Sequence, residues 1–308
     1  MHDALRFGIS ARLAPDSAGW LATARRAEAW GFSTFWMPDH VGTFDPFPAL
    51  VAASGVTDTL RLGTYVLNVE FWNPLLLARA AATADVVTGG RLVLGLGAGH
   101  AESEFHQAGL AYPSPGHRVA RLEATVAAVD RLLAGNTVDD ARLGLRGANL
   151  GFRAHQAHVP LLVGGNGDRV LRLAGARADI AGLVGFTSGT GQVQTNLTHW
   201  TWARLAERVA HVRRSASAAG RTDGPELDVL VQRVIVTDDR DRAAAELAAA
   251  TGTPAEHHLD SPFLLIGTRS EIAAQLIRLR REVGIAAVTI FENWAEALAP
   301  VIAELLGG

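Results

Sequence analysis

One helix, strand and loop decide the fold, and their sequence is NPLLLARAAATADVVTGGRLVLGLGAGH (residues 73–100). An alanine-rich helical pattern runs from Asn73 to Val87, and the apolar run Arg91–Leu96 after it has the length of a buried strand. A glycine-rich loop then leads to His100. A strand that follows a helix over a short connection is typical of a parallel α/β sheet.

The same alternation of strands and helices continues on both sides of this unit. We expect seven further strands, at residues 5–10, 33–37, 60–67, 159–163, 179–183, 228–237 and 287–291. Eight strands in βα order predict the α/β class and a single (β/α)8 TIM barrel, with residues 1–308 as one domain.

Three stretches break the repeat, and we interpret them as insertions at about residues 136–158, 185–198 and 255–261. The first two are rich in glycine and turn-forming residues, and we expect them near the mouth of the barrel. Between the last two predicted strands, Thr268 and Glu271 form a capping box that starts a helix, and Gly284 ends it.

The composition limits the class of protein. Hydrophobic residues make up 48% of the chain and charged residues 19%, which suits one large core. The 28 basic and 31 acidic residues are well mixed and give a net charge of −3, so a nucleic-acid partner is not expected. With no cysteine, no signal sequence and no long apolar run, we expect a cytoplasmic protein with no membrane partner that acts on a small molecule. Surface helices rich in Ala and Leu favour a homodimer.

Polar residues follow three of the predicted strands at their carboxyl ends, where the catalytic groups of such barrels lie. We expect them to surround one pocket. They are Asp39 and His40 after the second strand, Tyr65, Asn68 and Glu70 on and after the third, and His100, Ser103 and Glu104 after the fourth.

Two histidines and Asp39 are the candidate catalytic groups. Histidine titrates near neutral pH, and the carboxylate of Asp39 beside His40 can orient the ring for proton transfer. His100 is expected to turn into the pocket. A structural histidine in the barrel mouth and an exposed one on the loop are the alternatives for these two residues. A metal site made from these histidines and carboxylates is a further alternative, although we expect no metal.

The loop Val163-Gly164-Gly165-Asn166-Gly167 leads from a predicted strand directly into a helix. Glycine lets backbone N–H groups approach an anion, and the first turn of a helix adds N–H donors with a positive dipole end. This order of strand, glycines and helix predicts a phosphate site that needs no lysine. A plain tight turn is the alternative.

A second glycine-rich loop, at residues 95–100, fails the dinucleotide pattern G-x-G-x-x-G because His100 stands where the last glycine is needed. Gly97 and Gly99 suit a backbone that lies flat against a planar ring. Among the aromatic residues that follow strand ends, Phe71, Trp72 and Phe186 are predicted to line a substrate pocket, with core packing as the alternative.

At these motifs the chain resembles the luciferase-like monooxygenase superfamily and, within it, the deazaflavin (F420)-dependent oxidoreductases of actinobacteria. The resemblance runs nearly from end to end. The motifs that carry it are Phe35–His40, Arg61–Asn68 with Asn73-Pro74, Gly90–Glu102, Val163–Arg169 and Leu265–Thr268.

The resemblance implies that an F420 ring lies in the barrel mouth against the third strand, near a non-proline cis peptide at Tyr65-Val66. It also implies two sets of cofactor contacts. The ring contacts would be Asp39, Asn68, Gly97, Gly99 and Ser103, and the phosphate contacts Val163, Gly164, Gly165, Asn166 and Gly167.

The function implied is hydride transfer between C5 of F420 and a small, partly apolar substrate, while His40 or His100 handles the proton. One departure is informative. Sugar-phosphate dehydrogenases of this family carry a glutamate where this chain has His100 and a tryptophan where it has Phe44, which we place in the substrate pocket. A sugar phosphate is therefore not the expected substrate.

Three other functions fit the same sequence. The first is an FMN-dependent monooxygenase that receives reduced flavin from a separate reductase, since FMN would occupy the same loops and reacts with oxygen where F420 does not. The second is a flavin-binding protein without turnover, which two histidines in the pocket would disfavour. The third is a metal-dependent sugar isomerase on the same barrel.

Overall fold

The structure is a computed structural model that describes residues 5–185 and 200–307. Contacts divide the chain into two compact units. Unit 1 comprises residues 1–10, 26–33 and 165–308, and unit 2 comprises residues 11–25 and 34–164.

Within the described residues, parallel strands alternate with helices along the chain, and this order confirms the predicted (β/α)8 fold class. The strands are β1 (Arg6–Ser10), β2 (Thr34–Met37), β3 (Arg61–Thr64), β4 (Leu67–Asn68), β5 (Leu92–Gly97), β6 (Val138–Asp140), β7 (Leu145–Ala148), β8 (Leu161–Gly164), β9 (Ile180–Val184), β10 (Glu226–Leu230), β11 (Arg233–Val236), β12 (Leu264–Gly267) and β13 (Ala287–Phe291). The α-helices are α1 (Ser17–Ala29), α2 (Pro46–Ser54), α3 (Pro74–Val87), α4 (Glu102–Gln107), α5 (Pro115–Leu133), α6 (Asp168–Arg177), α7 (Trp202–Ala218), α8 (Arg240–Thr251), α9 (Ala255–Leu259), α10 (Arg269–Arg278) and α11 (Ala295–Gly307).

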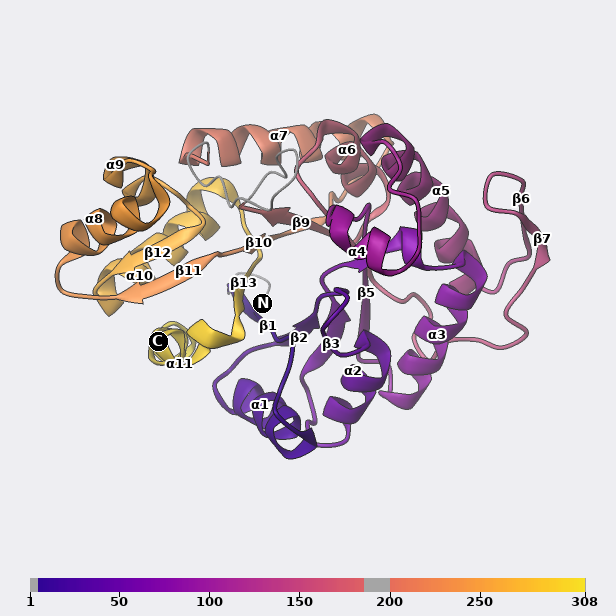
Figure 1. Cartoon of the computed structure of the whole chain (residues 1–308), viewed down its shortest axis with the longest axis horizontal. Helices are drawn as coiled ribbons and strands as arrows, with labels where there is room; N and C mark the ends of the chain where they lie inside the picture. Colours follow the sequence, from indigo (N-terminus) through magenta and orange to yellow (C-terminus); the bar gives the residue numbers. More distant parts are fainter. Residues whose placement is uncertain (1–4, 186–199, 308) are drawn as a thin grey trace. The chain divides into compact units, whose positions relative to one another are not determined.

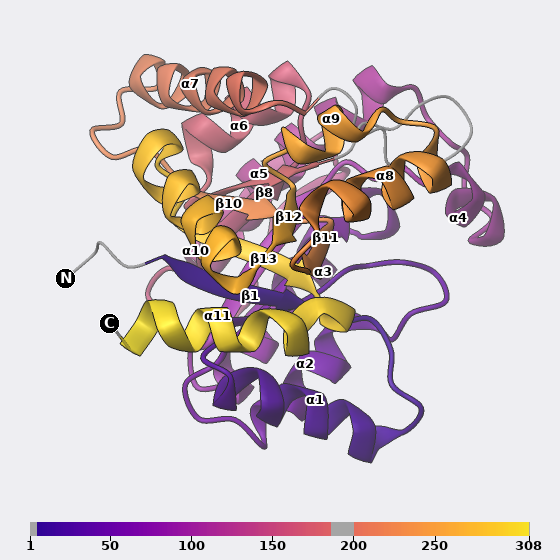
Figure 2. The same cartoon turned by 90° about the vertical axis from the view of Figure 1, so that its left-hand side faces the viewer.

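Unit 1 has a parallel sheet in which β1, β13, β10 and β9 follow one another side by side. The register places Ala287 of β13 opposite both Arg6 of β1 and Asp228 of β10, so β1 and β13 begin at the same level and β10 begins two residues earlier. Helices α6 and α7 lie side by side in both views of the molecule (Figures 1 and 2). The apolar centre of β13, which includes Val288 and Ile290, is fully buried.

The predicted strand at 228–237 is wrong as one element, because the chain changes partners in its middle. The N–H of Val231 donates to Thr289 O of β13, whereas the N–H of Gln232 donates to Phe263 O next to β12. The second half is therefore β11, which pairs in parallel with β12 in a separate two-stranded sheet. Helices α8 and α10 pack against β12 (Figure 1).

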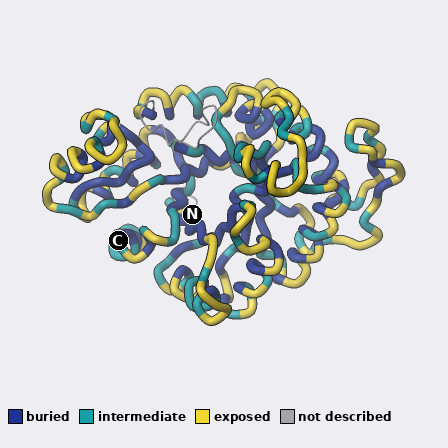
Figure 3. The backbone as a smooth tube through the Cα atoms, in the orientation of Figure 1, coloured by how far each residue is buried: buried dark blue, intermediate teal, exposed yellow. Residues whose placement is uncertain are grey.

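Unit 2 has a parallel sheet of β2, β3, β5 and β8, with β4 also paired to β5. The predicted strand at 60–67 is split into β3 and β4, and the peptide bond between Tyr65 and Val66, which lies in the break, is cis as the resemblance implied. A Cβ at Gly95 would lie 1.9 Å from Thr64 O, so only glycine lets β5 pass this strand so closely. The strands are buried while the outward faces of the helices are exposed (Figure 3).

The insertion at 136–158 forms the β6–β7 hairpin, much of which is exposed (Figure 3). The expectation that it lies near the barrel mouth is wrong. Its residue Gln156 donates from its backbone N–H to Asp85 near the end of α3, over 2.8 Å, and from its side chain to Leu92 O at the first residue of β5, over 2.9 Å. Both partners lie on the side of unit 2 where the strands begin, because this segment connects a helix to the strand after it.

The helix predicted from Thr268 to Gly284 is confirmed, including its capping box, in which Thr268 and Glu271 bond each other's backbone. Its last turn, Leu279–Val283, is a π-helix, and Gly284 ends it with φ of +83°. The insertion at 255–261 contains the short helix α9. Of the insertion at 185–198, all but Gly185 lies outside the described residues. In the described chain, no helix is long and apolar enough to cross a membrane.

Candidate active site

The carboxyl ends of β2, β4 and β5 in unit 2 carry the predicted catalytic groups. His40 lies three residues after β2, and His100 lies three residues after β5. Their rings meet edge to face, with centroids 5.7 Å apart and an interplanar angle of 88°. The structure therefore brings together two histidines with 59 residues between them in the sequence, as the barrel order predicts.

His40 is held by Glu104, a residue of helix α4. The Nδ1 atom of His40 lies 2.7 Å from Oε1 of Glu104, and both side chains are largely shielded from solvent. A carboxylate only accepts hydrogen bonds, so Nδ1 carries the proton that is shared with Glu104. The pair fixes the orientation of the ring and leaves Nε2 as the atom that can take or give a proton.

Asp39 faces the backbone instead of His40. Its Oδ2 atom accepts from the N–H of Asn68, over 3.2 Å, and from Nε1 of Trp72, over 3.1 Å. Burial raises the pKa of the Asp39 carboxyl above its ordinary value, and the bonds from Trp72 and Asn68 oppose that shift. Asp39 therefore positions β4 and Trp72, and the expectation that it orients His40 is wrong, because Glu104 does so.

His100 is half-buried and belongs to the loop that precedes α4. Burial lowers the pKa of His100 below its ordinary value, and the neighbouring His40 and Arg118 lower it further, while Glu104 opposes them. The backbone O of His100 accepts from the hydroxyl of Tyr112, over 3.1 Å. His100 is thus a neutral ring at pH 7, which can donate or accept a hydrogen bond without adding charge.

The two glycines of the loop are required by packing within unit 2. A Cβ at Gly97 would lie 2.4 Å from Cγ2 of Val66, and a Cβ at Gly99 would lie 2.3 Å from Oδ1 of Asn68. Gly99 also has φ of +71°, which side chains rarely adopt. The space that a side chain would need is therefore filled by Val66 and Asn68.

Unit 2 also holds an ion pair that was not predicted from the sequence. Glu70 and Arg121 approach to 3.4 Å, and Arg121 also donates to Trp72 O over 3.0 Å. Burial raises the pKa of Glu70, which Arg121 opposes. The buried Arg118 donates to Gly99 O over 3.2 Å and lies over the ring of Tyr112. Both arginines are thus engaged by backbone carbonyls and aromatic or acidic partners.

The predicted pocket residues lie in different surroundings. Phe71 packs against Phe105 with centroids 5.2 Å apart, and Trp72 packs edge-on against Phe47 at 5.5 Å. Phe44 is 36% exposed and meets Trp20 edge-on. Tyr65 is buried and Ser103 is exposed, and Phe186 lies outside the described residues.

The predicted phosphate loop ends β8 and leads into α6, as expected. The buried Val163 belongs to the strand, and a Cβ at Gly164 would lie 2.9 Å from Cγ1 of Val66. The N–H of Gly165 donates to Gly182 O, over 3.0 Å, and the side chain of Asn166 donates to Val184 O, over 2.5 Å. These two groups fasten the loop to β9.

The N-cap residue of helix α6 is Gly167, which has no side chain to cap the helix. The first N–H groups of α6 therefore have no side-chain acceptor of the usual kind. The one acid in this turn, Asp168, forms an ion pair with Arg208 at 2.5 Å. That hydrogen bond holds the pKa of Asp168 below its ordinary value, and Arg208 offsets its charge. An anion at this helix end would therefore meet N–H donors and a neutralised carboxylate.

The partners of the catalytic groups were not assigned roles from the sequence. Glu104 appeared only as a polar residue after the fourth strand, and it is 64 residues from the histidine that it holds. Arg118 and Arg121 belong to no local motif in the sequence. The available signal was the helical periodicity of α5, which turns both arginines inward, together with Glu70 after β4. Among the described residues, no group of three or more His, Asp or Glu is arranged to hold a metal ion.

Comparisons with known proteins show the family to which the chain is similar. A family model described as luciferase-like monooxygenase matches residues 8–262. The chain is 32% identical over 253 residues to an F420-dependent glucose-6-phosphate dehydrogenase of Nakamurella multipartita. That match covers 78% of this chain and 70% of that protein. It is 30% identical over 228 residues to a 5,10-methylenetetrahydromethanopterin reductase of Methanolobus tindarius, which covers 73% of this chain and 63% of that one. The match thus spans less than two thirds of the latter relative.

Solved structures share the fold over the whole chain. An F420-dependent secondary alcohol dehydrogenase in complex with an F420–acetone adduct superposes with a TM-score of 0.79 at 19% identity, covering 98% of this chain and 99% of that one. A long-chain alkane monooxygenase superposes with a TM-score of 0.76 at 15% identity, covering 100% and 92%. At these identities the likeness shows the fold alone.

Proposed function

The chain belongs to the luciferase-like monooxygenase family, and we propose that it is an F420-dependent oxidoreductase that moves a hydride to or from a small, partly apolar alcohol, carbonyl or imine. One observation carries this proposal. It is the hydrogen bond between His40 and Glu104 at the carboxyl ends of the unit 2 strands, which supplies an oriented proton donor and acceptor. Curated relatives named as F420-dependent enzymes support the choice of cofactor.

F420, when bound, would supply or accept the hydride. The protein's part is to handle the accompanying proton. With Nδ1 held by Glu104, His40 uses Nε2 to take the hydroxyl proton as an alcohol is oxidised, or to return one as a carbonyl is reduced. The neutral His100, whose ring meets that of His40, donates or accepts a hydrogen bond at the substrate oxygen. His40 is thus the proposed proton carrier and His100 the proposed orienting group.

The residues that would hold the cofactor fall into two groups. In unit 2, Tyr65, Val66, Asn68, Gly97 and Gly99 form a tightly packed surface in which the glycine backbones carry no Cβ toward their neighbours. We place the planar ring against this surface, with Asp39 and Ser103 as further proposed ring contacts. At the start of α6, Gly167 and the first helical N–H groups suit the phosphate, because no side chain caps them.

A sugar phosphate is not the proposed substrate. Two arginines of α5, Arg118 and Arg121, are both used within unit 2. Arg118 bonds Gly99 O, and Arg121 bonds Glu70 and Trp72 O. The aromatic residues Phe44, Phe71 and Trp72 offer apolar contact instead.

Steady-state assays with F420 test the proposal. We expect turnover when oxidised F420 is offered with secondary alcohols, or reduced F420 with ketones, enones or imines, and slower turnover with glucose 6-phosphate. Preference for glucose 6-phosphate would contradict the substrate class. Absence of turnover with all of these compounds, in a protein that binds F420, would contradict the reaction.

FMN is the competing cofactor, because solved structures with the same fold include FMN enzymes such as the oxygenating part of a diketocamphane monooxygenase. An FMN enzyme of this kind would consume oxygen and need reduced flavin from a separate reductase. We therefore expect no substrate-dependent oxygen uptake with reduced FMN, measured with an oxygen electrode.

We also propose that two copies of the chain associate. Helix α3 exposes Leu76, Val86 and Val87, which are 46%, 46% and 57% accessible to solvent. Three large apolar side chains on one helix favour burial against another surface. Light scattering during gel filtration should give twice the mass of the 32.5 kDa chain, and a monomer mass would contradict this proposal.

A further inference from the structure

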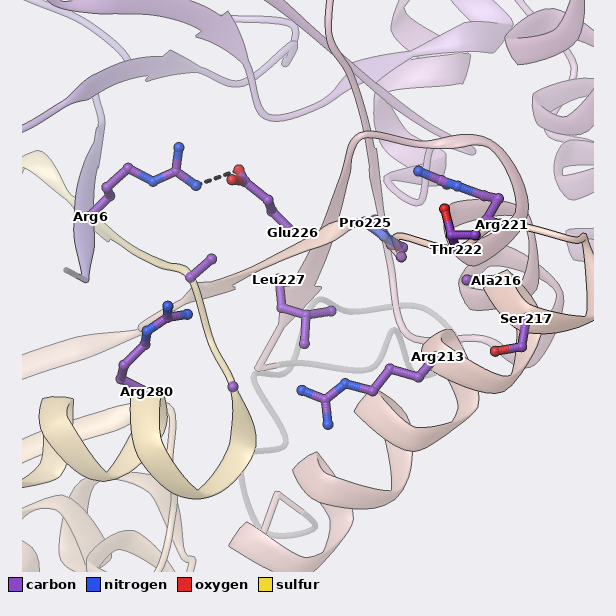
Figure 4. Close-up of a pocket in the computed structure, with 13 residues that line it drawn as sticks. Arg6, Arg213, Ala216, Ser217, Arg221, Thr222, Pro225, Glu226, Leu227 and Arg280 are labelled. Carbon is purple, nitrogen blue, oxygen red and sulfur yellow. Dashed lines mark hydrogen bonds and ion pairs between the residues drawn. The ribbon is translucent and has the colours of Figure 1, made fainter. Parts of the chain in front are cut away.

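A cationic cavity in unit 1 is used by neither of the two groups of cofactor residues described above. Its volume is about 630 Å³, which is within the range of small-molecule sites. It lies at the amino ends of β1 and β10, whose first residues are Arg6 and Glu226, and next to the start of β13. The lining residues are Arg6, Arg213, Ala216, Ser217, Arg221, Thr222, Gly224, Pro225, Glu226, Leu227, Arg280, Gly284 and Ala286 (Figure 4).

Two of the arginines are fixed on one turn of the chain. Arg213 of α7 donates to Val283 O, over 3.0 Å, and Arg280 donates to Ile285 O, over 3.4 Å. In Figure 4 Arg213 extends from its helix toward the middle of the cavity, and Arg280 rises from a different helix. A Cβ at Gly284, between the two acceptors, would lie 2.3 Å from Nη2 of Arg213, the end of that flexible side chain. The sequence thus holds a guanidinium against this turn.

The acidic charge of the lining is too small to balance the arginines. Arg6 forms an ion pair with Glu226, the one acid in the lining. Arg221 donates to the carbonyls of Gly175 and Ala178 at the end of α6, over 2.9 and 2.7 Å. Within the described residues, Arg213 has no acidic partner. Because Arg6 uses Glu226, the described lining holds no acid for Arg213 or Arg221.

We propose that this cavity binds a small organic anion that carries two or more phosphate or carboxylate groups. Guanidinium groups held by neutral carbonyls keep their full charge and present further N–H donors in a planar fork that matches such oxyanions. Arg213 would bind one anionic group and Arg221 a second. The apolar surfaces of Pro225 and Leu227 would face the carbon skeleton. The site is independent of the proposed hydride transfer.

Isothermal titration of the full chain with pyrophosphate and, separately, with citrate tests the proposal at constant ionic strength. We expect saturable binding of one equivalent with a Kd of about 1 mM or tighter for at least one of them. Whichever binds more tightly identifies the phosphate or the carboxylate class. The variant R213Q should weaken that binding at least about tenfold, because it removes a charged hydrogen-bond donor to the anion.

Arg214 provides the matched control. It is exposed, it is the next residue on α7, and it does not line the cavity. R214Q has the same change in charge as R213Q and should bind as the wild type does. Each variant is compared with its own thermal unfolding curve, so that ligand-induced stabilisation is measured on folded protein.

Three results would overturn the proposal. The first is no saturable binding of either anion by the wild type. The second is an equal loss in R214Q and R213Q, which would indicate a general effect of charge. The third is unchanged binding in R213Q, which would place the anion elsewhere, for instance at the start of α6.

Discussion

The histidine site of unit 2 and the arginine cavity of unit 1 use charge in opposite ways. In the histidine site each charged group has a side-chain partner: His40 bonds Glu104, and Glu70 approaches Arg121. In the cavity, Arg213 and Arg221 donate to backbone carbonyls, which do not neutralise them. The first arrangement controls where a proton lies, and the second leaves positive charge for a ligand from solution.

The largest expected effect is at His40. H40A removes the group that carries the proton, and we expect kcat to fall by about 10²- to 10⁴-fold, the usual contribution of a general acid or base. Binding of F420, followed by fluorescence, should persist, and so should anion binding in the cavity. The control is H106A, an exposed histidine of α4, which should keep wild-type turnover. Unchanged kcat in H40A would show that the proton travels by another group.

Glu104 is expected to matter less than His40, because it acts by holding the ring. E104Q keeps the size of the side chain and weakens the bond at Nδ1 of His40. We expect kcat to fall about 10- to 100-fold, the scale of a misplaced catalytic group, while KM stays within about twofold. A rise in KM with kcat unchanged would mean that Glu104 contacts substrate instead of positioning His40.

Gly99 tests whether the loop beside the histidines is as tightly packed as the structure indicates. G99A places a Cβ 2.3 Å from Asn68 at φ of +71°. Gly109 has nearly the same φ, +70°, with nothing within 4 Å of its Cβ position, so G109A carries the backbone strain alone. We expect the free energy of unfolding to fall by about 1–3 kcal/mol more in G99A than in G109A, measured in urea. Equal losses would show that the loop has room to move.

The smallest expected effect is the pH dependence caused by His100. Burial lowers the pKa of folded His100 below 6.5, the ordinary value that it regains on unfolding. The unfolded chain therefore binds more protons as pH falls below 6.5, and stability is lost until pH passes the folded pKa. The wild type should lose more stability than H100Q over this range in urea titrations. If H100Q keeps the whole pH dependence, another group causes it, and H106Q is the control for an exposed histidine.

Much of the fold followed from the sequence, because its signals are local. The capping box of Thr268 and Glu271 starts a helix and Gly284 ends it, in each case by bonds within a few residues. The strand at 287–291 was placed at its observed bounds. The split between β10 and β11 was missed, because it depends on Val231 and Gln232 bonding two different strands far along the chain.

The candidate site was predictable in its residues and not in its bonds. Strand ends indicated Asp39, His40, Asn68 and His100, since catalytic groups of barrels lie there. Proximity in sequence suggested that Asp39 orients His40, but the partner is Glu104 on a later helix. The arginine cavity gave no signal in sequence, since its cations come from a strand, two helices and a loop that no motif connects.

Equilibrium binding of oxidised F420 and of FMN to the purified protein, followed by fluorescence, tests the central claim most directly. Hydride transfer with F420 predicts that F420 binds at least about tenfold more tightly than FMN, a difference of about 1.4 kcal/mol. Tighter binding of FMN, or binding of neither, would contradict the account.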